Sequence, residues 1–289
     1  MRLLLLLLPL GLFAQLNIAV SYPYIGVLTK EIGGKNINTI VLAKGNWDPH
    51  FIVPRPSLIS KVRNADGLIM NGAQLEIGWL PPLMKRASNP KIKMNSATFL
   101  NLSHHVALIS KPKNFTREGG DIHPDGNPHF NLDPKNILIL ANVIKEYLSL
   151  IDSKNAKNYT NNYDKFRNVW EKKMLEWDLR MQSKKGTKII QYHDVLGYFI
   201  KAYGLQSVGN IEPLPGIPPS SKHTFNLIEL IKKEKVVYIV HDVYHSMKTA
   251  EYISSKTDIP IILMPHDVQS LNSIGNLVSL FDYLTSAIK

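Results

Sequence analysis

Short runs of β-branched and aliphatic residues alternate along the chain with longer segments that are apolar on one face only. The runs predict buried strands and the segments between them predict helices, an alternation typical of parallel α/β units. We expect strands at 16–20, 39–42, 67–71, 91–94, 188–192, 236–240 and 259–263, and helices at 56–65, 134–151, 221–233 and 246–255. The predicted fold class is therefore α/β, with two groups of parallel strands far apart in the sequence.

One segment between the two strand groups has the pattern of a single long helix. Large apolar side chains recur there at spacings of three and four residues, which places them on one helix face. They are Tyr159, Tyr163, Phe166, Trp170, Met174, Trp177 and Met181. A coiled-coil dimer is the alternative, but bulky aromatic residues suit packing across two lobes better than a heptad seam. We expect a connecting helix at 156–183 between an N-terminal α/β lobe at 16–155 and a C-terminal α/β lobe at 184–289.

The N-terminus has the pattern of a secretory signal peptide over residues 1–15. Arg2 precedes an apolar run from Leu3 to Leu8, and small residues follow near Ala14. The run is too short to span a bilayer, which takes about 20 residues. We therefore expect an exported protein that, in a Gram-negative cell, resides in the periplasm.

The amino-acid composition limits the kinds of functional site that the chain can form. The chain has no cysteine, which excludes disulfides, thiolate metal ligands, cysteine nucleophiles and a lipid-modified cysteine, so we do not expect a lipoprotein. Its 34 lysines and arginines against 23 acidic residues give a net charge of +11. These basic residues are scattered rather than clustered, so nucleic acid is not an expected partner. Any metal must be bound by histidine, aspartate or glutamate.

Histidines recur at the ends of predicted strands and after prolines. His193 directly follows the predicted strand 188–192, and His50 and His129 each follow a proline, whose fixed φ makes a rigid turn. Ligands of open parallel sheets bind beyond the carboxyl ends of the strands. Three such histidines and one carboxylate can form a tetrahedral zinc site, although spacing alone does not establish that they converge. The chain has no HExxH motif, which disfavours a helix-borne metalloprotease site.

Several longer motifs occur in an order that matches a known family. They are Asp48-Pro49-His50 with Pro54-Arg55-Pro56-Ser57, Asn71-Gly72 with Leu75-Glu76 and Trp79-Leu80, the run from Gly126 to Pro134, Tyr192-His193-Asp194 with Gly197-Tyr198-Phe199, Glu212-Pro213, and Pro219-Ser220-Ser221-Lys222-His223. Through them, nearly the whole chain after the signal peptide resembles the zinc-uptake type of periplasmic solute-binding proteins, which serve zinc and manganese ABC importers.

The resemblance implies a two-lobed protein with one metal ion between the lobes. The ligands it implies are His50, His129, His193 and, in the loop after the last strand, Asp267. That loop departs from the usual form, so a slip of one residue would place His266 at the metal instead. Manganese-binding members carry a carboxylate at the position of His193. Three imidazoles therefore favour Zn²⁺, with Mn²⁺ disfavoured and Cu²⁺ still able to compete.

The same resemblance implies a transport function without catalysis. The expected partner is the membrane permease of an ABC importer with its cytoplasmic ATPase, and a periplasmic metallochaperone is a second possible partner. We expect the protein to be a monomer. The stretch 102–126, with His104, His105 and His123, either collects metal or is an ordinary surface loop. The alternatives are an exported zinc-dependent enzyme with Glu76 as general base, a metal-binding adhesin, and a binding protein for an organic solute.

Overall fold

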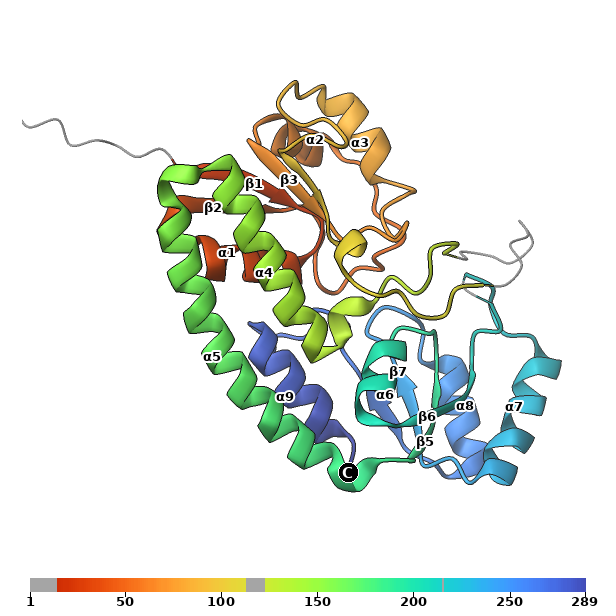
Figure 1. Ribbon diagram of the computed structural model, residues 1–289. Coiled ribbons are helices and arrows are strands. Elements are labelled where there is room, and N and C mark those ends of the chain that lie inside the picture. The colour runs from red at the N-terminus through yellow and green to blue at the C-terminus, as the bar shows by residue number, and fades with distance from the viewer. Residues whose placement is uncertain (1–14, 113–122, 215) are drawn as a thin grey trace, which may run out of the picture.

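Two parallel sheets of four strands each form the framework of the protein (Figure 1). The computed structural model describes residues 15–112, 123–214 and 216–289, so the predicted signal peptide lies almost entirely outside it. The first sheet has the order β2-β1-β3-β4 and the second the order β6-β5-β7-β8. Their strands are β1 (Leu16–Val20), β2 (Ile37–Val41), β3 (Gly67–Met70), β4 (Phe99–Asn101), β5 (Lys188–Gln191), β6 (Gln206–Asn210), β7 (Tyr238–His241) and β8 (Ile261–Leu263). The predicted fold class of two parallel-sheet α/β lobes is confirmed.

Helices cover the sheets, and proline sets the start of four of them. α1 to α4 each have a proline in the first turn, where its missing N–H leaves no hydrogen bond unmade. Asp133 caps α4 by accepting a hydrogen bond from the backbone N–H of Lys135 at 2.9 Å. The helices are α1 (Pro23–Gly33), α2 (Pro56–Arg63), α3 (Leu80–Ala87), α4 (Pro134–Ile151), α5 (Ala156–Met181), α6 (Gly197–Tyr203), α7 (Ser221–Glu234), α8 (Lys248–Thr257) and α9 (Leu277–Ala287).

The long helix α5 runs along one side of the molecule past both lobes (Figure 1). It packs against α1 and α4 of the first lobe and against α9, the last helix of the chain. Trp170 and Trp177 are fully buried, and their rings meet Phe281 of α9 at centroid distances of 5.5 and 5.1 Å. The aromatic stripe therefore packs within the chain, as predicted, instead of forming a coiled-coil seam.

One hydrophobic core extends through both lobes. It includes Ile18 and Leu68 of the first sheet, Trp177 of α5, and Ile189 and Val240 of the second sheet. A smaller core lies in the second lobe and includes residues of α7 and α8. Helix α9 belongs to the predicted C-terminal lobe, but it packs against α1 of the N-terminal lobe as well as against α5. The residue limits of the two lobes therefore stay a prediction.

Two edge strands differ from the sequence-based expectation. The predicted strand at 91–94 is wrong, because the Asn89 side chain bonds to the backbone of Val62, Ala65 and Lys91 and fixes a turn there. The sheet is completed instead by β4. β6 was not predicted, because an exposed strand lacks an apolar run. Among the described residues, no helix is long and apolar enough to cross a membrane.

Candidate metal centre

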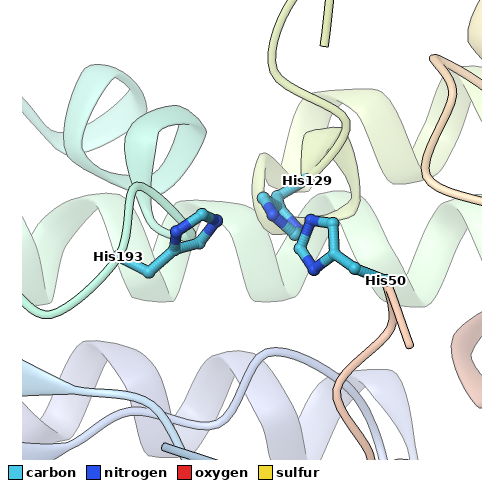
Figure 2. Close-up of side chains that lie close together, drawn as sticks. All are labelled: His50, His129 and His193. Atoms are coloured by element: carbon cyan, nitrogen blue, oxygen red, sulfur yellow. The ribbon is translucent and has the colours of Figure 1, made fainter. Parts of the chain in front are cut away.

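Three histidines from separate segments converge between the two sheets. His50 lies in the loop after β2, His129 precedes a short 3₁₀ helix (Phe130–Leu132), and His193 follows β5. One ring nitrogen from each lies within 4.8 Å of those of the other two. Figure 2 shows the three rings turned toward one another, and their centroids are 5.5 to 5.8 Å apart. The structure thus brings these three predicted ligands together, and metal binding by them stays a prediction.

Carboxylates orient two of the three rings. Asp48 Oδ1 lies 2.9 Å from His50 Nδ1, and Glu212 Oε2 lies 2.6 Å from His193 Nδ1. A carboxylate at Nδ1 fixes the proton on that nitrogen and leaves the Nε2 lone pair available, the usual arrangement for a metal-bound histidine. Burial raises the pKa of Asp48, but hydrogen bonds from the ring and backbone of His50, together with the charges of His50 and His245, hold the pKa below its ordinary value.

The third ring, that of His129, has a buried nitrogen without a partner. Its Nε2 atom is inaccessible to solvent and accepts or donates no hydrogen bond within the described part of the chain. Burial, followed by the neighbouring His50 and His193, lowers the pKa of His129 well below its ordinary value, so the ring is neutral. A buried polar atom left unpaired is costly, which indicates that a ligand belongs at this nitrogen.

The turn that carries His129 is braced from the second lobe. The His129 backbone N–H donates to Asn127 Oδ1 at 2.9 Å, and Asn127 Nδ2 donates to the backbone oxygen of Asp194 at 2.7 Å. Asp194 follows His193 directly. The segments that carry His129 and His193 are therefore connected across the lobes through the Asn127 side chain.

Asp267 lies outside the group of three histidines. Its side chain is buried, and Oδ1 accepts a hydrogen bond from the Val268 N–H at 2.6 Å. Burial raises its pKa well above the ordinary value, against hydrogen bonds from the backbone of Val268 and of Tyr24. Tyr24 lies in the first turn of α1, where the helix dipole also favours a carboxylate. Asp267 as a metal ligand stays a prediction.

His266, the alternative fourth ligand, has its ring buried against Tyr244. The centroids are 5.0 Å apart, and Nδ1 of His266 has no hydrogen-bond partner in the described part of the chain. Burial lowers its pKa to about 4, against the charges of Asp242 and Asp48. The ring is therefore neutral, but no hydrogen bond connects it to the three converging histidines.

His123 lies directly beside this centre. Its Nε2 atom is 3.2 Å from Nε2 of His50, and the two rings are stacked with centroids 5.2 Å apart. Both rings line a groove of about 360 Å³ whose other walls include Phe51 and Ile77. His104 and His105 instead line a separate groove with Asp125. Residues 113–122 of the predicted metal-collecting stretch lie outside the described residues.

The remaining histidines of the region bond elsewhere. His241 bonds to the backbone oxygens of Asp242 and Ser246, and His223 bonds to that of Asn210. The pairing of Glu212 with His193 was not anticipated, since the two residues are 19 positions apart and no local spacing marks them. Only the motif Glu212-Pro213 in the family resemblance pointed to that carboxylate.

Glu76 is fully buried and supports the loop beside the centre. Its carboxylate accepts hydrogen bonds from the N–H groups of Asn71 and Gly72 at 2.7 and 3.0 Å. The next two residues, Ala73 and Gln74, have φ of 49° and 65°, a conformation that side chains disfavour. Asn71 in turn donates from Nδ2 to the backbone oxygen of Pro128 at 3.0 Å, directly before His129. Glu76 thus holds a strained loop in place.

We expect Glu76→Ala to lower the free energy of unfolding by about 2 kcal/mol. The buried Gly72 N–H loses its acceptor, which costs roughly 1–3 kcal/mol, whereas the Asn71 N–H keeps Ser21 Oγ at 3.1 Å. Glu76→Gln keeps one acceptor oxygen and should lose clearly less. Urea unfolding followed by circular dichroism measures both variants, and equal stability of Glu76→Ala and the wild type would contradict this role.

The pairing of buried Asp242 with half-buried His245 predicts a pH dependence of stability. Asp242 Oδ2 lies 2.8 Å from His245 Nδ1. Although burial opposes it, bonding to His245 lowers the pKa of Asp242 to about 2, and bonding to Asp242 raises the pKa of His245. The Asp242 contribution to stability is lost as pH falls from about 4 to 2. The His245 contribution is present below about pH 6.5 and is lost as pH rises through its raised pKa.

Asp242→Asn should therefore lower the free energy of unfolding most between about pH 4 and 6.5, by about 2 kcal/mol. Urea unfolding at a series of pH values measures the difference. Asp164→Asn is the matched control, because Asp164 pairs with Arg167 at the surface of α5, where such pairs contribute about 0–1 kcal/mol. A difference that does not change with pH would contradict the assignment.

The fold and the centre together define a two-lobed α/β binding protein with a histidine cluster between its lobes. The family model described as zinc-uptake complex component A, periplasmic (ZnuA), matches residues 18–289, and the chain belongs to this family. The resemblance inferred from the sequence motifs is thereby confirmed.

Curated relatives bind several metals. The chain is 23% identical to the zinc-binding lipoprotein AdcA of Streptococcus pneumoniae, over 95% of this chain and 55% of that protein. It is 28% identical to the metal ABC transporter substrate-binding lipoprotein ScbA of Streptococcus cristatus and 26% identical to the manganese ABC transporter substrate-binding lipoprotein PsaA of Streptococcus mitis, in both cases over 86% of this chain and 78% of the relative. The chain spans about half the length of the zinc-binding relatives. AdcA, ScbA and PsaA are each described as a lipoprotein, which conflicts with the expectation that this chain is not a lipoprotein.

Solved structures share the fold. The crystal structure of ZnuA superposes with a TM-score of 0.79 at 23% identity, covering 96% of this chain and 100% of that one. A Mn-bound periplasmic metal-binding protein from Candidatus Liberibacter asiaticus has a TM-score of 0.77 at 19% identity, covering 95% and 98%. Both likenesses extend over the two lobes and the helix between them.

Proposed function

We propose that this protein captures Zn²⁺ outside the cytoplasmic membrane, in the periplasm, and delivers it to the permease of an ABC importer. The observation that carries the proposal is the convergence of His50, His129 and His193 within 4.8 Å. Zinc binds imidazole nitrogen at about 2.0–2.1 Å in tetrahedral sites, so a modest contraction of this group would surround the ion.

The donor set supports zinc over manganese. Neutral imidazole suits zinc and copper, whereas manganese prefers oxygen donors. The carboxylates that contact the three histidines, Asp48 and Glu212, are engaged with the Nδ1 atoms of His50 and His193. Both zinc-binding and manganese-transporting proteins occur among the relatives, so the choice rests on these side chains. Cu²⁺ binds such sites more tightly than zinc, and its exclusion depends on metal supply.

Transport also fits the centre better than catalysis does. A catalytic zinc ion keeps an open position for water, and a general base must lie beside that water. Glu76, the general base considered for an enzyme, instead accepts hydrogen bonds from two backbone N–H groups in a fully buried position. We propose that the protein is not an enzyme and that its partners are the permease and the ATPase of the importer.

Metal titration tests the proposal. We expect the purified chain from residue 16, stripped of metal, to bind one zinc ion tightly and to prefer zinc to manganese in competition. Elemental analysis gives the stoichiometry and calorimetry gives the affinity. Failure to bind zinc would overturn the proposal in favour of an organic solute. Recovery on the cell surface instead of the periplasm on fractionation would favour an adhesin.

A further inference from the structure

The loop between β8 and α9 reaches from the second lobe to the two segments of the first lobe that carry His50 and His129. We propose that its residues 266–270 position the metal centre, with Ser270 as the main positioning residue, by fixing the spacing between those two segments. The inference rests on the proposed function, because it concerns the geometry of the same zinc site. One attachment at each end of the 266–270 loop carries it.

Ser270 attaches one end of the 266–270 loop to the segment before His50. Its side chain is buried, and Oγ donates a hydrogen bond to the backbone oxygen of Gly45 at 2.7 Å. The same Oγ accepts a hydrogen bond from the Asp267 N–H at 3.1 Å, and the Ser270 N–H donates back to the Asp267 oxygen at 3.3 Å. One hydroxyl therefore joins the loop of Asp267 to the loop of His50.

Gly45 permits the close approach of the two backbones at this attachment. A β-carbon at position 45 would lie 2.0 Å from the backbone oxygen of Val268 and 2.8 Å from the backbone nitrogen of Ser270. Both distances are far inside van der Waals contact, and backbone atoms cannot rotate away as a side chain can. Val268 is fully buried in the core that extends through both lobes, so a retreat of the loop would disturb that core. The close approach therefore requires glycine.

Asn131 attaches the other end of the 266–270 loop to the segment of His129. Its buried side chain donates from Nδ2 to the backbone oxygen of His266 at 2.9 Å. Asn131 lies in the 3₁₀ helix Phe130–Leu132, which directly follows His129. The loop is thus held to the first lobe at both ends, which keeps the two histidine-bearing segments at one distance from each other.

A fixed spacing of His50 and His129 favours zinc over manganese. Their ring centroids are 5.6 Å apart, and zinc requires imidazole nitrogens at about 2.0–2.1 Å in a tetrahedral arrangement. Manganese prefers oxygen ligands in an octahedral arrangement, and selectivity between such ions comes from geometry and ligand type. The loop also carries Asp267, the predicted fourth ligand, so the same attachments set its place relative to the histidines. Releasing the loop should therefore weaken zinc binding more than manganese binding.

Titration of Ser270→Ala and Gly45→Ala with Zn²⁺ and Mn²⁺ tests the inference. We expect each variant to bind zinc about 10- to 100-fold more weakly, the range for losing a residue that orients a metal ligand. Manganese affinity should fall much less. Ser254→Ala is the matched control, because Ser254 Oγ also donates to a backbone oxygen, that of Ile259 at 2.8 Å, but within the second lobe. This control should bind both ions as the wild type does.

Cobalt spectroscopy separates a change of geometry from a loss of stability. Co²⁺ can replace Zn²⁺, and it absorbs visible light far more strongly in a tetrahedral site than in a six-coordinate one. We expect the absorption of the cobalt-loaded protein to weaken in Ser270→Ala and to stay unchanged in Ser254→Ala. Because Ser270→Ala adds no bulk to the core, it tests the inference even where Gly45→Ala does not fold.

The outcomes separate this inference from the proposed function. Unchanged zinc affinity and an unchanged cobalt spectrum in Ser270→Ala would overturn the role of the 266–270 loop and leave the three-histidine site intact. Equal losses of zinc and manganese affinity, with the cobalt spectrum of the wild type, would mean that the substitution only loosens the fold, and would also overturn it. The same holds if Ser254→Ala lost as much zinc affinity as Ser270→Ala. Absence of zinc binding in the wild type would overturn the proposed function itself.

Discussion

His129→Ala is expected to abolish tight zinc binding and, with it, the stabilisation that zinc gives to the folded protein. His129 offers a fully buried nitrogen without a partner among the described residues, at the point where both other rings converge. A ligand that binds only the folded state adds about 4 kcal/mol to its stability when its free concentration is a thousand times the dissociation constant. That gain should fall close to zero in the variant, because the two remaining histidines cannot enclose the ion.

Denaturant unfolding with and without zinc, together with calorimetric titration, measures both effects. His223→Ala is the control, since His223 lies on α7 and bonds to the backbone of Asn210, outside the centre. The control should keep the full zinc-dependent gain. If zinc stabilised His129→Ala as much as the wild type, the metal would bind elsewhere and the three-histidine centre would be excluded.

Trp177→Ala is expected to lower the free energy of unfolding by about 3–5 kcal/mol, the range for removing a large buried aromatic side chain. Trp177 is fully buried, meets Trp170 at 5.0 Å and Phe281 at 5.1 Å, and donates from Nε1 to Asp282 at 2.8 Å. The substitution leaves a cavity between α5 and α9 and leaves the Asp282 carboxylate without one of its donors.

Leu179→Ala on the same helix is the matched control for this substitution. Leu179 is 72% exposed, and substitutions at such positions usually change stability by no more than about 0.5 kcal/mol. Urea unfolding of the wild type and both variants gives the comparison. Similar losses in the two variants would contradict a dominant role for packing between α5 and α9 at Trp177.

Local sequence patterns predicted the elements with strong periodicity. The aromatic stripe indicated a helix at 156–183, and the structure has one at Ala156–Met181. The helix predicted at 134–151 matches α4 (Pro134–Ile151), since a first-turn proline marks the start of a helix within a few residues. The edge strand β6 was missed because exposed Gln206 and Ser207 lie at its start, so little of its sequence records burial.

The candidate site was predictable only in part, because residues that are far apart in the sequence make many of its contacts. Rigid turns and strand ends selected His50, His129 and His193, and the family resemblance supplied their common role. Contacts that depend on the tertiary structure could not be predicted from local sequence patterns. The sequence did not indicate that the Asp267 carboxylate would bond to the backbone of Tyr24, or that His123 would lie against His50.

The continuous core also limits how the protein can move. Trp170, Trp177 and Phe281 belong to the same packed cluster as residues of both sheets. Each aromatic side chain buries about 150–250 Å², so exposing all three would cost on the order of 10 kcal/mol at about 25 cal/mol per Å². That is comparable with the whole stability of a typical protein, about 5–15 kcal/mol. The lobes thus share one packed core, and we expect the zinc ion of the proposed function to enter and leave by rearrangement of loops and side chains instead of a swing of one lobe away from the other.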